Sequence, residues 1–362
     1  IFGYDVMHGY RTIFPIPLGE TASWDPEAAE AAARVAAREA AAAGVHWTFA
    51  PMVDIARDPR WGRIAEVSGE DPYLGSAMAA ARVRGFQGKD VRAPDAVLAT
   101  VKVFAAYGGA EGGRDYNTVD LSDRTMREVY LAPYRAGIDA GAGTVMASFN
   151  EIGGIPSTAS PWLMTTVLRR EWGFKGFVVS DWTAVAELLN HGVAGTRADA
   201  GKLALEAGVD MDMVSRIYVD DLPALVRAGR IPSAVVNEAV RRVLSAKAAL
   251  GLFDDAYHGA TVEREQAALL APAHRQLARR VAEESIVLLK NDGQRLPLGA
   301  SVKTIAVIGP LADDQVSALG SWAGRGDPRD AVTPLEGIKA RADSVSVVYE
   351  KGCGITDTAT AG

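Results

Sequence analysis

The chain has 362 residues, 48% of them hydrophobic and 23% charged, which is the composition of an ordinary globular protein. Its formal net charge is −7 and its basic residues are scattered, which excludes the electrostatic footprint of a nucleic-acid-binding protein. No apolar stretch approaches the roughly 20 residues that span a bilayer. The single cysteine, Cys353, excludes an internal disulfide framework and a cysteine-based zinc cluster.

Short apolar runs alternate with helical stretches from residue 1 to about residue 215. The runs, each expected to form a strand, cover residues 2–5, 47–54, 97–102, 143–150, 176–181 and 208–212. Helices are expected over residues 27–43, 123–140, 162–171 and 197–207. Pro26 suits the first turn of the first helix and Gly44 its stop. Strands that alternate with helices at this spacing predict a parallel α/β sheet.

Two α/β architectures compete: an open doubly wound sheet and a closed (β/α)8 barrel. No glycine-rich phosphate loop opens a helix after any strand, which weakens the dinucleotide-binding version. Several apolar runs end instead in a polar or ionisable residue, namely Asp5, Asp54, Lys102, Asn150 and Asp181. In a barrel those strand ends converge on one face, where active sites lie. We therefore expect residues 1–215 to form a (β/α)8 TIM-type barrel.

The pattern changes beyond residue 215. Residues 216–284 are expected to be the helical end of the barrel and a linker, with helices over 222–228, 233–250 and 274–284 and a polar stretch over 253–265. Strands are expected to return over 285–289, then as a buried strand over 304–308, and over 345–349. We expect residues 285–362 to be the truncated beginning of an α/β/α sandwich domain. The chain opens inside a strand without an initiator methionine, which predicts a piece of a longer protein.

Asp181 follows the apolar run Phe177-Val-Val-Ser180, so that a rigid strand would hold its carboxylate at a pocket mouth. Glycoside hydrolysis needs carboxylates beside the anomeric carbon, and the neighbouring Trp182 offers a flat apolar face for a pyranose ring. An equally compatible interpretation is that Asp181 caps the following helix.

Three further side chains suit the same chemistry. Asp5 could accept hydrogen bonds from two sugar hydroxyls. Considered alone, it is more readily interpreted as an ordinary carboxylate at the start of a loop. The dense run Arg57-Asp-Pro-Arg-Trp-Gly-Arg63 could form a surface ion-pair network or point an arginine at sugar hydroxyls. Lys102 could donate to a substrate, act as a Schiff-base nucleophile as in barrel aldolases, or simply extend its amine from the core edge. His8 is expected to be structural, and no metal site is expected, because no second histidine or cysteine lies at metal spacing.

Taken together, these segments resemble glycoside hydrolase family 3, most closely its bacterial periplasmic-type β-glucosidases. The matching segments run in the family's order along almost the whole chain. They are Gly3-Tyr-Asp-Val-Met-His-Gly9, Ala50-Pro-Met-Val-Asp54, Arg57-Asp-Pro-Arg-Trp-Gly-Arg63, Gly69-Glu-Asp71, Phe104-Ala-Ala-Tyr-Gly108, Glu111-Gly-Gly-Arg-Asp-Tyr-Asn117, Gly173-Phe-Lys-Gly-Phe-Val-Val-Ser-Asp-Trp182 and Val287-Leu-Leu-Lys-Asn291.

The resemblance implies a retaining, exo-acting β-glucosidase that needs no cofactor or metal. Asp181 matches the catalytic nucleophile, and the residues that match those holding the glycone hydroxyls are Asp5, Arg63 and Lys102. The positions that match the lining of the −1 subsite are Met146, Phe149 and Trp182, with Phe149 standing where relatives often have tyrosine. The implied substrate is a β-linked oligosaccharide or an aryl or alkyl β-glucoside, and the implied location is periplasmic or secreted. The resemblance leaves the oligomeric state open.

Two departures from the family pattern accompany this resemblance. Where the family typically has Lys-His, this chain has Lys102-Val103, and valine has no donor for a sugar hydroxyl. We expect weaker glycone binding, slower turnover or a changed sugar preference. The family's general acid/base is a glutamate on a sandwich-domain loop; none can be assigned here, and Glu350 comes too early. The first barrel strand and helix are also expected to be missing.

Four alternatives compete with the β-glucosidase interpretation. A β-xylosidase or a broad-specificity glycosidase of the same family fits the same residues. The N-acetylhexosaminidase branch is disfavoured, because residues 108–117 contain no histidine for its Asp-x-His arrangement. A catalytically impaired sugar-binding homologue is suggested by Val103 and the unassigned acid/base. An aldolase using Lys102 is the fourth.

Overall fold

The computed structural model describes residues 1–356. Its strands are β1 (Gly3–Tyr4), β2 (Trp47–Thr48), β3 (Thr100–Phe104), β4 (Thr144–Ala147), β5 (Glu151–Ile152), β6 (Ile155–Pro156), β7 (Phe177–Val179), β8 (Thr304–Ile308) and β9 (Ser346–Glu350). Its α-helices are α1 (Pro17–Thr21), α2 (Pro26–Ala42), α3 (Pro72–Gln87), α4 (Asp123–Thr125), α5 (Ala132–Asp139), α6 (Ala184–Glu187), α7 (Arg197–Ala207), α8 (Ile217–Asp220), α9 (Leu222–Arg227), α10 (Ser233–Ala249), α11 (Val262–Ala268), α12 (Pro272–Glu284) and α13 (Pro334–Lys339). The segments η4 (Met126–Tyr130) and η6 (Trp162–Glu171) are π-helical.

The central strands run parallel and follow one another in chain order. β1 pairs with β2, β3 pairs with β4, and β4 pairs with β7. Parallel bridges from Met52 to Lys102 and from Val179 to Met211 extend this row at both ends of the three-stranded sheet. Parallel neighbours in chain order, with helical segments between them, are the arrangement of a (β/α)8 barrel. The predicted barrel class is confirmed, and the doubly wound alternative is not.

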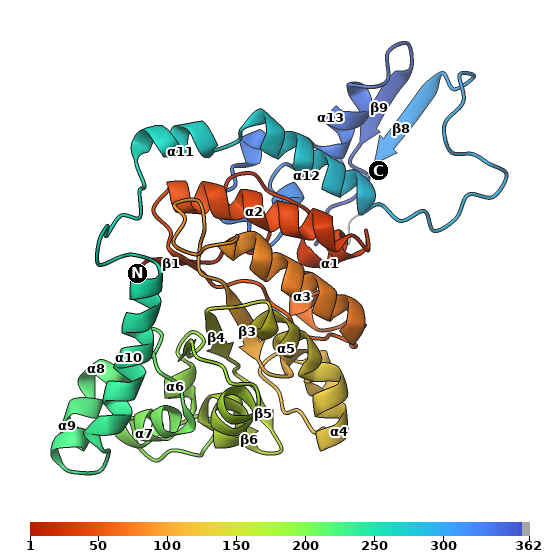
Figure 1. Ribbon diagram of the computed structural model, residues 1–362. Coiled ribbons are helices and arrows are strands. Elements are labelled where there is room, and N and C mark those ends of the chain that lie inside the picture. Colours follow the sequence, from red (N-terminus) through yellow and green to blue (C-terminus); the bar gives the residue numbers. More distant parts are fainter. Residues whose placement is uncertain (357–362) are drawn as a thin grey trace.

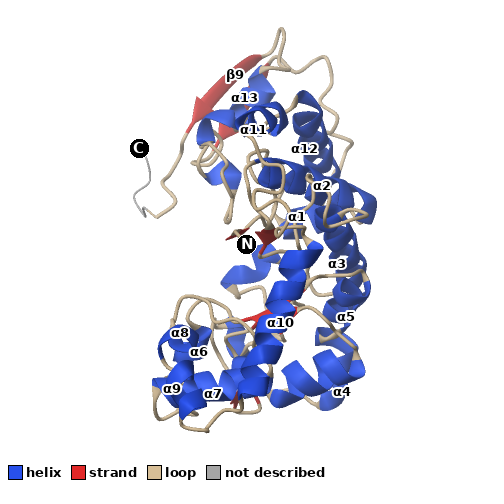
Figure 2. Cartoon of the chain, turned by 60° about the vertical axis from the view of Figure 1, so that its left-hand side comes forward, coloured by secondary structure: helices blue, strands red, loops and turns tan. Residues whose placement is uncertain are grey.

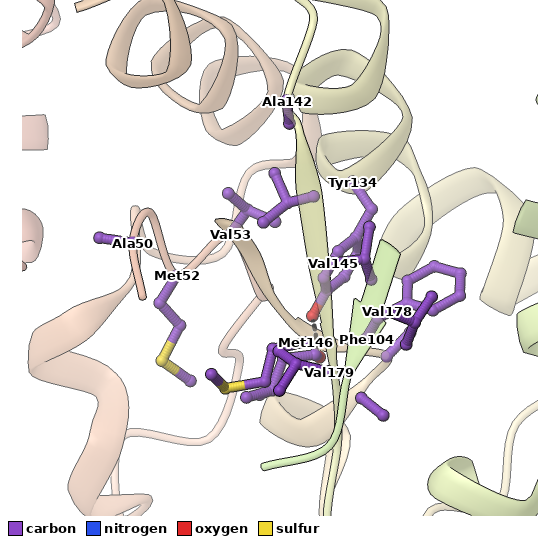
Figure 3. Packing of buried hydrophobic residues seen from close by; sticks show 14 of the residues in the cluster. Ala50, Met52, Val53, Phe104, Tyr134, Ala142, Val145, Met146, Val178 and Val179 are labelled. Atoms are coloured by element: carbon purple, nitrogen blue, oxygen red, sulfur yellow. Dashed lines mark hydrogen bonds between the residues drawn. The ribbon is translucent and has the colours of Figure 1, made fainter. Parts of the chain in front are cut away.

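Equivalent positions of neighbouring strands contribute to an apolar core between the strands and the helices, where Val101 packs against Gly137 of α5. Val101, Val145 and Val178 have no exposed surface. Figure 3 shows Met52 and Met146 packed inside this cluster, while Tyr134 enters it from α5. Helices α2, α3 and α5 line one side of the molecule, outside the strands (Figure 2). The strands are thereby buried on both faces, which explains their unbroken apolar sequence.

Helix α2 matches the prediction closely, whereas α3 was not predicted. Asp25 caps α2, its carboxylate accepting from the amides of Glu27 and Ala28. Helix α3 contains two glycines, which weaken a helical pattern in sequence. One of them, Gly85, lets α3 approach α2, since a Cβ there would come within 2.4 Å of the Glu30 carbonyl oxygen. The close packing of α3 on α2 therefore depends on a glycine, a residue type that weakens the prediction of a helix from sequence.

The second part of the chain contains helices and one strand pair. Helix α12 packs along α2, and β8 lies parallel to β9 beside α13 (Figure 1). The predicted strand over 285–289 is wrong: the segment has no strand partner among residues 1–356, and its apolar side chains are exposed. Strand β8 exists as predicted but is buried only at Val307, because β9 is its one neighbour within the described chain. Residues 357–362 of the predicted sandwich segment lie outside the described residues.

The polar stretch predicted over 253–265 is only partly irregular, since α11 begins at Val262 behind its cap Thr261. None of the helices between residues 1 and 356 combines the length and the apolar composition needed to cross a bilayer.

Candidate active site

Asp5 and Lys102 form an ion pair at the carboxyl ends of the first and third strands. Asp5 follows β1 directly, and Lys102 lies in β3. The Lys102 ammonium donates to Asp5 Oδ1 at 2.8 Å, with the lysine side chain almost fully buried and the aspartate side chain about one-third exposed. The pair therefore presents one carboxylate oxygen and the remaining ammonium hydrogens toward a partly open space.

Asp181 lies just beyond the end of β7, where neighbouring segments fix it. The Ser180 amide donates to the Met211 carbonyl oxygen, and the Met213 amide donates to the Ser180 hydroxyl. The Asp181 carboxylate accepts from the Trp182 amide through Oδ1 at 2.7 Å, while Oδ2 has no hydrogen-bond partner among residues 1–356. Helix α6 begins later, with Thr183 at its N-cap position and without a side-chain cap. The helix-cap interpretation of Asp181 is therefore wrong.

The environment of Asp181 combines burial with nearby positive charge. Burial raises the pKa of its carboxyl above the ordinary value, and the charge of Asp5 adds to that rise. Lys102, the Trp182 amide and Arg63 act in the opposite direction and favour the ionised carboxylate. The three charged residues predicted from the sequence, Asp5, Arg63 and Lys102, thus all act on Asp181.

Arg63 is held by a buried carboxylate. Its Nε and Nη2 atoms donate to the two oxygens of Glu66 at 2.7 and 3.0 Å, which is a bidentate arrangement. Burial disfavours the Arg63 charge, but Glu66 outweighs it and raises the Arg63 pKa. Nη1 has no hydrogen-bond partner among the described residues, so the fork keeps donors for a ligand. The surface-network interpretation fits Arg60 with Asp58, not Arg63.

Aromatic side chains form a wall beside Arg63. The Tyr107 ring lies 5.4 Å from the Arg63 guanidinium carbon, and Phe149 packs on Tyr107 and Tyr116 with ring centroids 5.8 and 4.6 Å apart. Tyr116 is half-exposed, and its pKa is raised by burial and by carboxylates that include Asp181. Sequence reasoning assigned no role to Tyr107 or Tyr116, although both lie in segments that resemble the family.

The other lining positions predicted from the sequence differ in exposure. Met146 lies in β4 and Phe149 follows it, and both are buried. Trp182 beside Asp181 is 61% exposed, which leaves its ring free to pack on a ligand. Val103 lies within β3 and is completely buried, so its apolar side chain offers no donor to this site.

A segment of the second part of the chain reaches the barrel site. The Trp322 ring lies 5.4 Å from the Lys102 ammonium. Its segment is fastened to the barrel, because His8 Nε2 lies 2.6 Å from the Ser321 carbonyl oxygen and the Tyr4 hydroxyl donates to the Gly324 carbonyl oxygen. His8 is thus structural, as predicted. Nothing in the sequence pattern placed Trp322 near Lys102.

No group of three or more histidine, cysteine, aspartate or glutamate side chains within residues 1–356 is arranged to hold a metal ion. The site instead offers a carboxylate with a free oxygen, two cations and an aromatic wall. Those groups can hold hydroxyls, stack on a ring and supply an oxygen nucleophile. A barrel with such a site is typical of glycoside hydrolases.

Comparison with known proteins specifies the family. Residues 1–246 match the glycosyl hydrolase family 3 N-terminal domain, and residues 286–361 match the glycosyl hydrolase family 3 C-terminal domain. The chain belongs to glycosyl hydrolase family 3.

The relatives include enzymes for two sugars. A periplasmic β-glucosidase of Salmonella typhimurium is 48% identical over 98% of this chain and 47% of its own length. A β-xylosidase of Formosa agariphila is 37% identical over 96% of this chain and 50% of its own length. Crystal structures of a β-glucosidase from Listeria innocua, one of them in complex with laminaribiose, have a TM-score of 0.94 and 42% identity over 99% of this chain and 49% of theirs. The chain thus spans about half the length of the relatives it matches.

Proposed function

We propose that the protein is a retaining, exo-acting β-glucosidase that removes terminal non-reducing β-D-glucosyl residues from β-linked oligosaccharides or from aryl and alkyl β-glucosides. The observation that carries this proposal is the setting of Asp181. Its carboxylate stands at a barrel strand end with one oxygen free, and the rise in its pKa caused by burial is opposed by Lys102 and Arg63, which favour the charged form. An ionised, fixed carboxylate with a free oxygen is what attack on an anomeric carbon requires.

In the proposed reaction Asp181 attacks C1 of the sugar from the face opposite the leaving group. The glycosidic bond breaks, and a covalent glycosyl-Asp181 intermediate forms. The family resemblance implies a glutamate as general acid/base, which would protonate the departing oxygen and then activate the water that cleaves the intermediate. The two displacements give net retention, with the two carboxyl groups roughly 5–5.5 Å apart. No cofactor or metal takes part in this proposal.

Recognition of the sugar is assigned to the surrounding residues. We propose that Asp5, Arg63 and Lys102 hold the glycone hydroxyls, because each carries unused acceptors or donors beside Asp181. The subsite around the sugar ring is proposed to be lined by Met146, Phe149 and Trp182. The aldolase alternative is disfavoured, because the Lys102 amine that a Schiff base would need is engaged with Asp5 at 2.8 Å.

Two further assignments accompany the proposal. Because one relative is a β-xylosidase, we retain a β-xyloside as an alternative substrate of this protein. We also infer a periplasmic or secreted location from the family resemblance. The domain boundaries after residues 215 and 284 remain predictions; the start of the C-terminal family match at residue 286 supports the second.

The proposal is tested on the full-length protein with laminaribiose and with 4-nitrophenyl β-D-glucoside and β-D-xyloside. Release of glucose whose first-formed anomer is β in proton NMR is expected, with faster hydrolysis of the glucoside than of the xyloside. A first-formed α-anomer would exclude Asp181 as nucleophile. Sugar binding without release of the phenol would instead identify an impaired sugar-binding homologue.

A further inference from the structure

Asp54 is a buried carboxyl group for which the proposed reaction gives no role. It lies two residues after Met52, the bridge partner of Lys102, and it has no exposed surface. It forms no ion pair within residues 1–356. Burial raises its pKa to about 7, against the effect of hydrogen bonds from Tyr134 and from the amides of Gly108, Tyr107 and Ile55. A carboxyl group without a cation is tolerated in such a place when it is hydrogen-bonded or neutral.

Asp54 connects two segments that are distant in sequence. Its Oδ2 atom accepts from the Tyr107 amide at 2.9 Å and lies 2.7 Å from the Tyr134 hydroxyl. The same hydroxyl, inside the core cluster of Figure 3, is hydrogen-bonded to the Val103 carbonyl oxygen. One hydroxyl hydrogen cannot serve two acceptors fully. If Asp54 is protonated, it can donate to Tyr134, and Tyr134 can then donate to Val103.

The hydrogen bonds from Asp54 through Tyr134 to Val103 form a relay, and Tyr107 is bonded to Asp54 at its other end. Both ends of this relay adjoin residues proposed to bind the sugar. Val103 follows Lys102, the residue paired with Asp5. Tyr107 carries the ring on which Arg63 rests, 5.4 Å from the guanidinium carbon. A change in the hydrogen bonding of Asp54 therefore bears on the position of both cations that act on Asp181.

We propose that Asp54, in its protonated form, is a positioning residue. Through the hydrogen bonds from Asp54 to Tyr134 and from Tyr134 to Val103, it orders the end of β3 that carries Lys102. Through the Tyr107 amide, it orders the residue on whose ring Arg63 rests. This inference rests on the proposed function, because it takes Lys102 and Arg63 to be sugar-binding residues. Asp54 itself does not touch the substrate.

The groups around Asp54 explain why its charge state matters. The titratable groups that face it are the phenols of Tyr130 and Tyr134, whose pKa values are raised by burial and by the charge of Asp54, so they stay neutral. Arg57 and Arg63 act on those tyrosines without pairing to Asp54, and Arg63 is already paired to Glu66. When Asp54 ionises, the Tyr134 hydroxyl turns to the carboxylate and the Val103 carbonyl loses its donor. Sugar affinity then falls as the pH rises through the Asp54 pKa.

The test measures binding of a non-hydrolysable aryl β-D-thioglucoside to the full-length protein by calorimetry, below and above pH 7. Wild-type affinity is expected to fall roughly tenfold on the alkaline side, the scale of one hydrogen bond left unmade. Asp54→Asn, which is neutral at every pH and keeps an oxygen for the Tyr107 amide, is expected to lose this pH dependence. Tyr134→Phe is expected to bind weakly at both pH values. Asp139→Asn, an exposed substitution in the same helix as Tyr134, is the matched control and should behave as wild type.

Infrared difference spectra of wild type minus Asp54→Asn provide a second measurement that needs no activity. A protonated-carboxyl band below pH 7 that disappears above it is expected. Persistence of the binding transition in Asp54→Asn, or absence of that band, overturns the inference and leaves the glycosidase proposal intact. If the band titrates as expected but no glycoside is hydrolysed, the proposed function fails and the protonation of Asp54 stands.

Discussion

The Lys102 ammonium and the Asp5 carboxylate lie 2.8 Å apart although β2 separates their strands in the row. The two side chains thus meet across the segment that lies between their strands. Their contact places a fixed positive charge near Asp181 and leaves Asp5 with an acceptor for a ligand. This pair is the basis of the prediction for Lys102 below.

Asp181→Ala is expected to lower kcat for 4-nitrophenyl β-D-glucoside by roughly 10⁴-fold, the scale on which loss of a covalent nucleophile acts. Added azide should restore turnover in this variant and give the α-glucosyl azide, because the small anion attacks C1 in place of the carboxylate. The product is identified by NMR. Glu187→Ala, a nearby partly buried carboxylate, is the control and should keep most of the activity. A β-configured azide product would contradict the assignment.

Lys102→Met is expected to weaken glycone binding by roughly tenfold or more, because a charge-assisted hydrogen bond is lost. It should also move the acid limb of the kcat/KM profile to higher pH. Lys102 lowers the Asp181 pKa, so its removal lets that pKa rise, and the ionised nucleophile then forms only at higher pH. The measurement is a pH profile with an aryl glucoside. Lys175→Met, an exposed lysine just before β7, should leave the profile unchanged.

Val103→His is expected to raise kcat/KM for β-glucosides by roughly tenfold, since an unpaired buried polar group costs about 1–3 kcal/mol. The side chain at this position follows Lys102 and is fully buried. The comparison includes the glucoside and the xyloside, so that a change in sugar preference is visible. Val103→Leu is the control for size alone. Equal or lower activity of the histidine variant on both substrates would show that valine is not a deficiency here.

Glu20→Gln is expected to destabilise the protein by about 3–5 kcal/mol, because it leaves the Arg82 charge buried without its partner. Arg82 donates to Glu20 Oε2 at 2.7 Å, and both side chains are almost completely buried. Urea unfolding followed by circular dichroism measures the change. The exposed pair Arg124 and Glu128 is the control, and Glu128→Gln should change stability by less than about 0.5 kcal/mol. Similar effects of the two substitutions would refute the role of burial.

Gly85→Ala is expected to destabilise the protein by about 1–3 kcal/mol even though alanine favours a helix, because its Cβ would overlap the Glu30 carbonyl oxygen and the Ala33 side chain. Gly337 in α13 has no atom within 4 Å of its hypothetical Cβ. Gly337→Ala should therefore stabilise or be neutral, by up to about 1 kcal/mol. Thermal unfolding distinguishes the two. A stabilising Gly85→Ala would show that α2 and α3 can separate freely.

The sequence by itself determined the local elements and the types of residue at the strand ends. Apolar runs mark the parallel strands, because strands covered on both faces are apolar throughout, and Asp181 followed such a run. The same local signal failed where partners matter. Residues 285–289 have a strand-like composition, but a strand exists only when another backbone accepts its hydrogen bonds, and none does so among residues 1–356.

Only the tertiary structure decided which of the strand-end residues meet. Asp5, Asp54, Lys102 and Asp181 look alike in sequence, yet Asp54 turns into the core toward Tyr134 while the other three share a site. Trp322 reaches Lys102 from a different part of the chain. Side-chain direction, burial and contacts between distant segments are set by packing in three dimensions. A one-dimensional pattern records the residue types that such packing uses, but not the partners that it gives them.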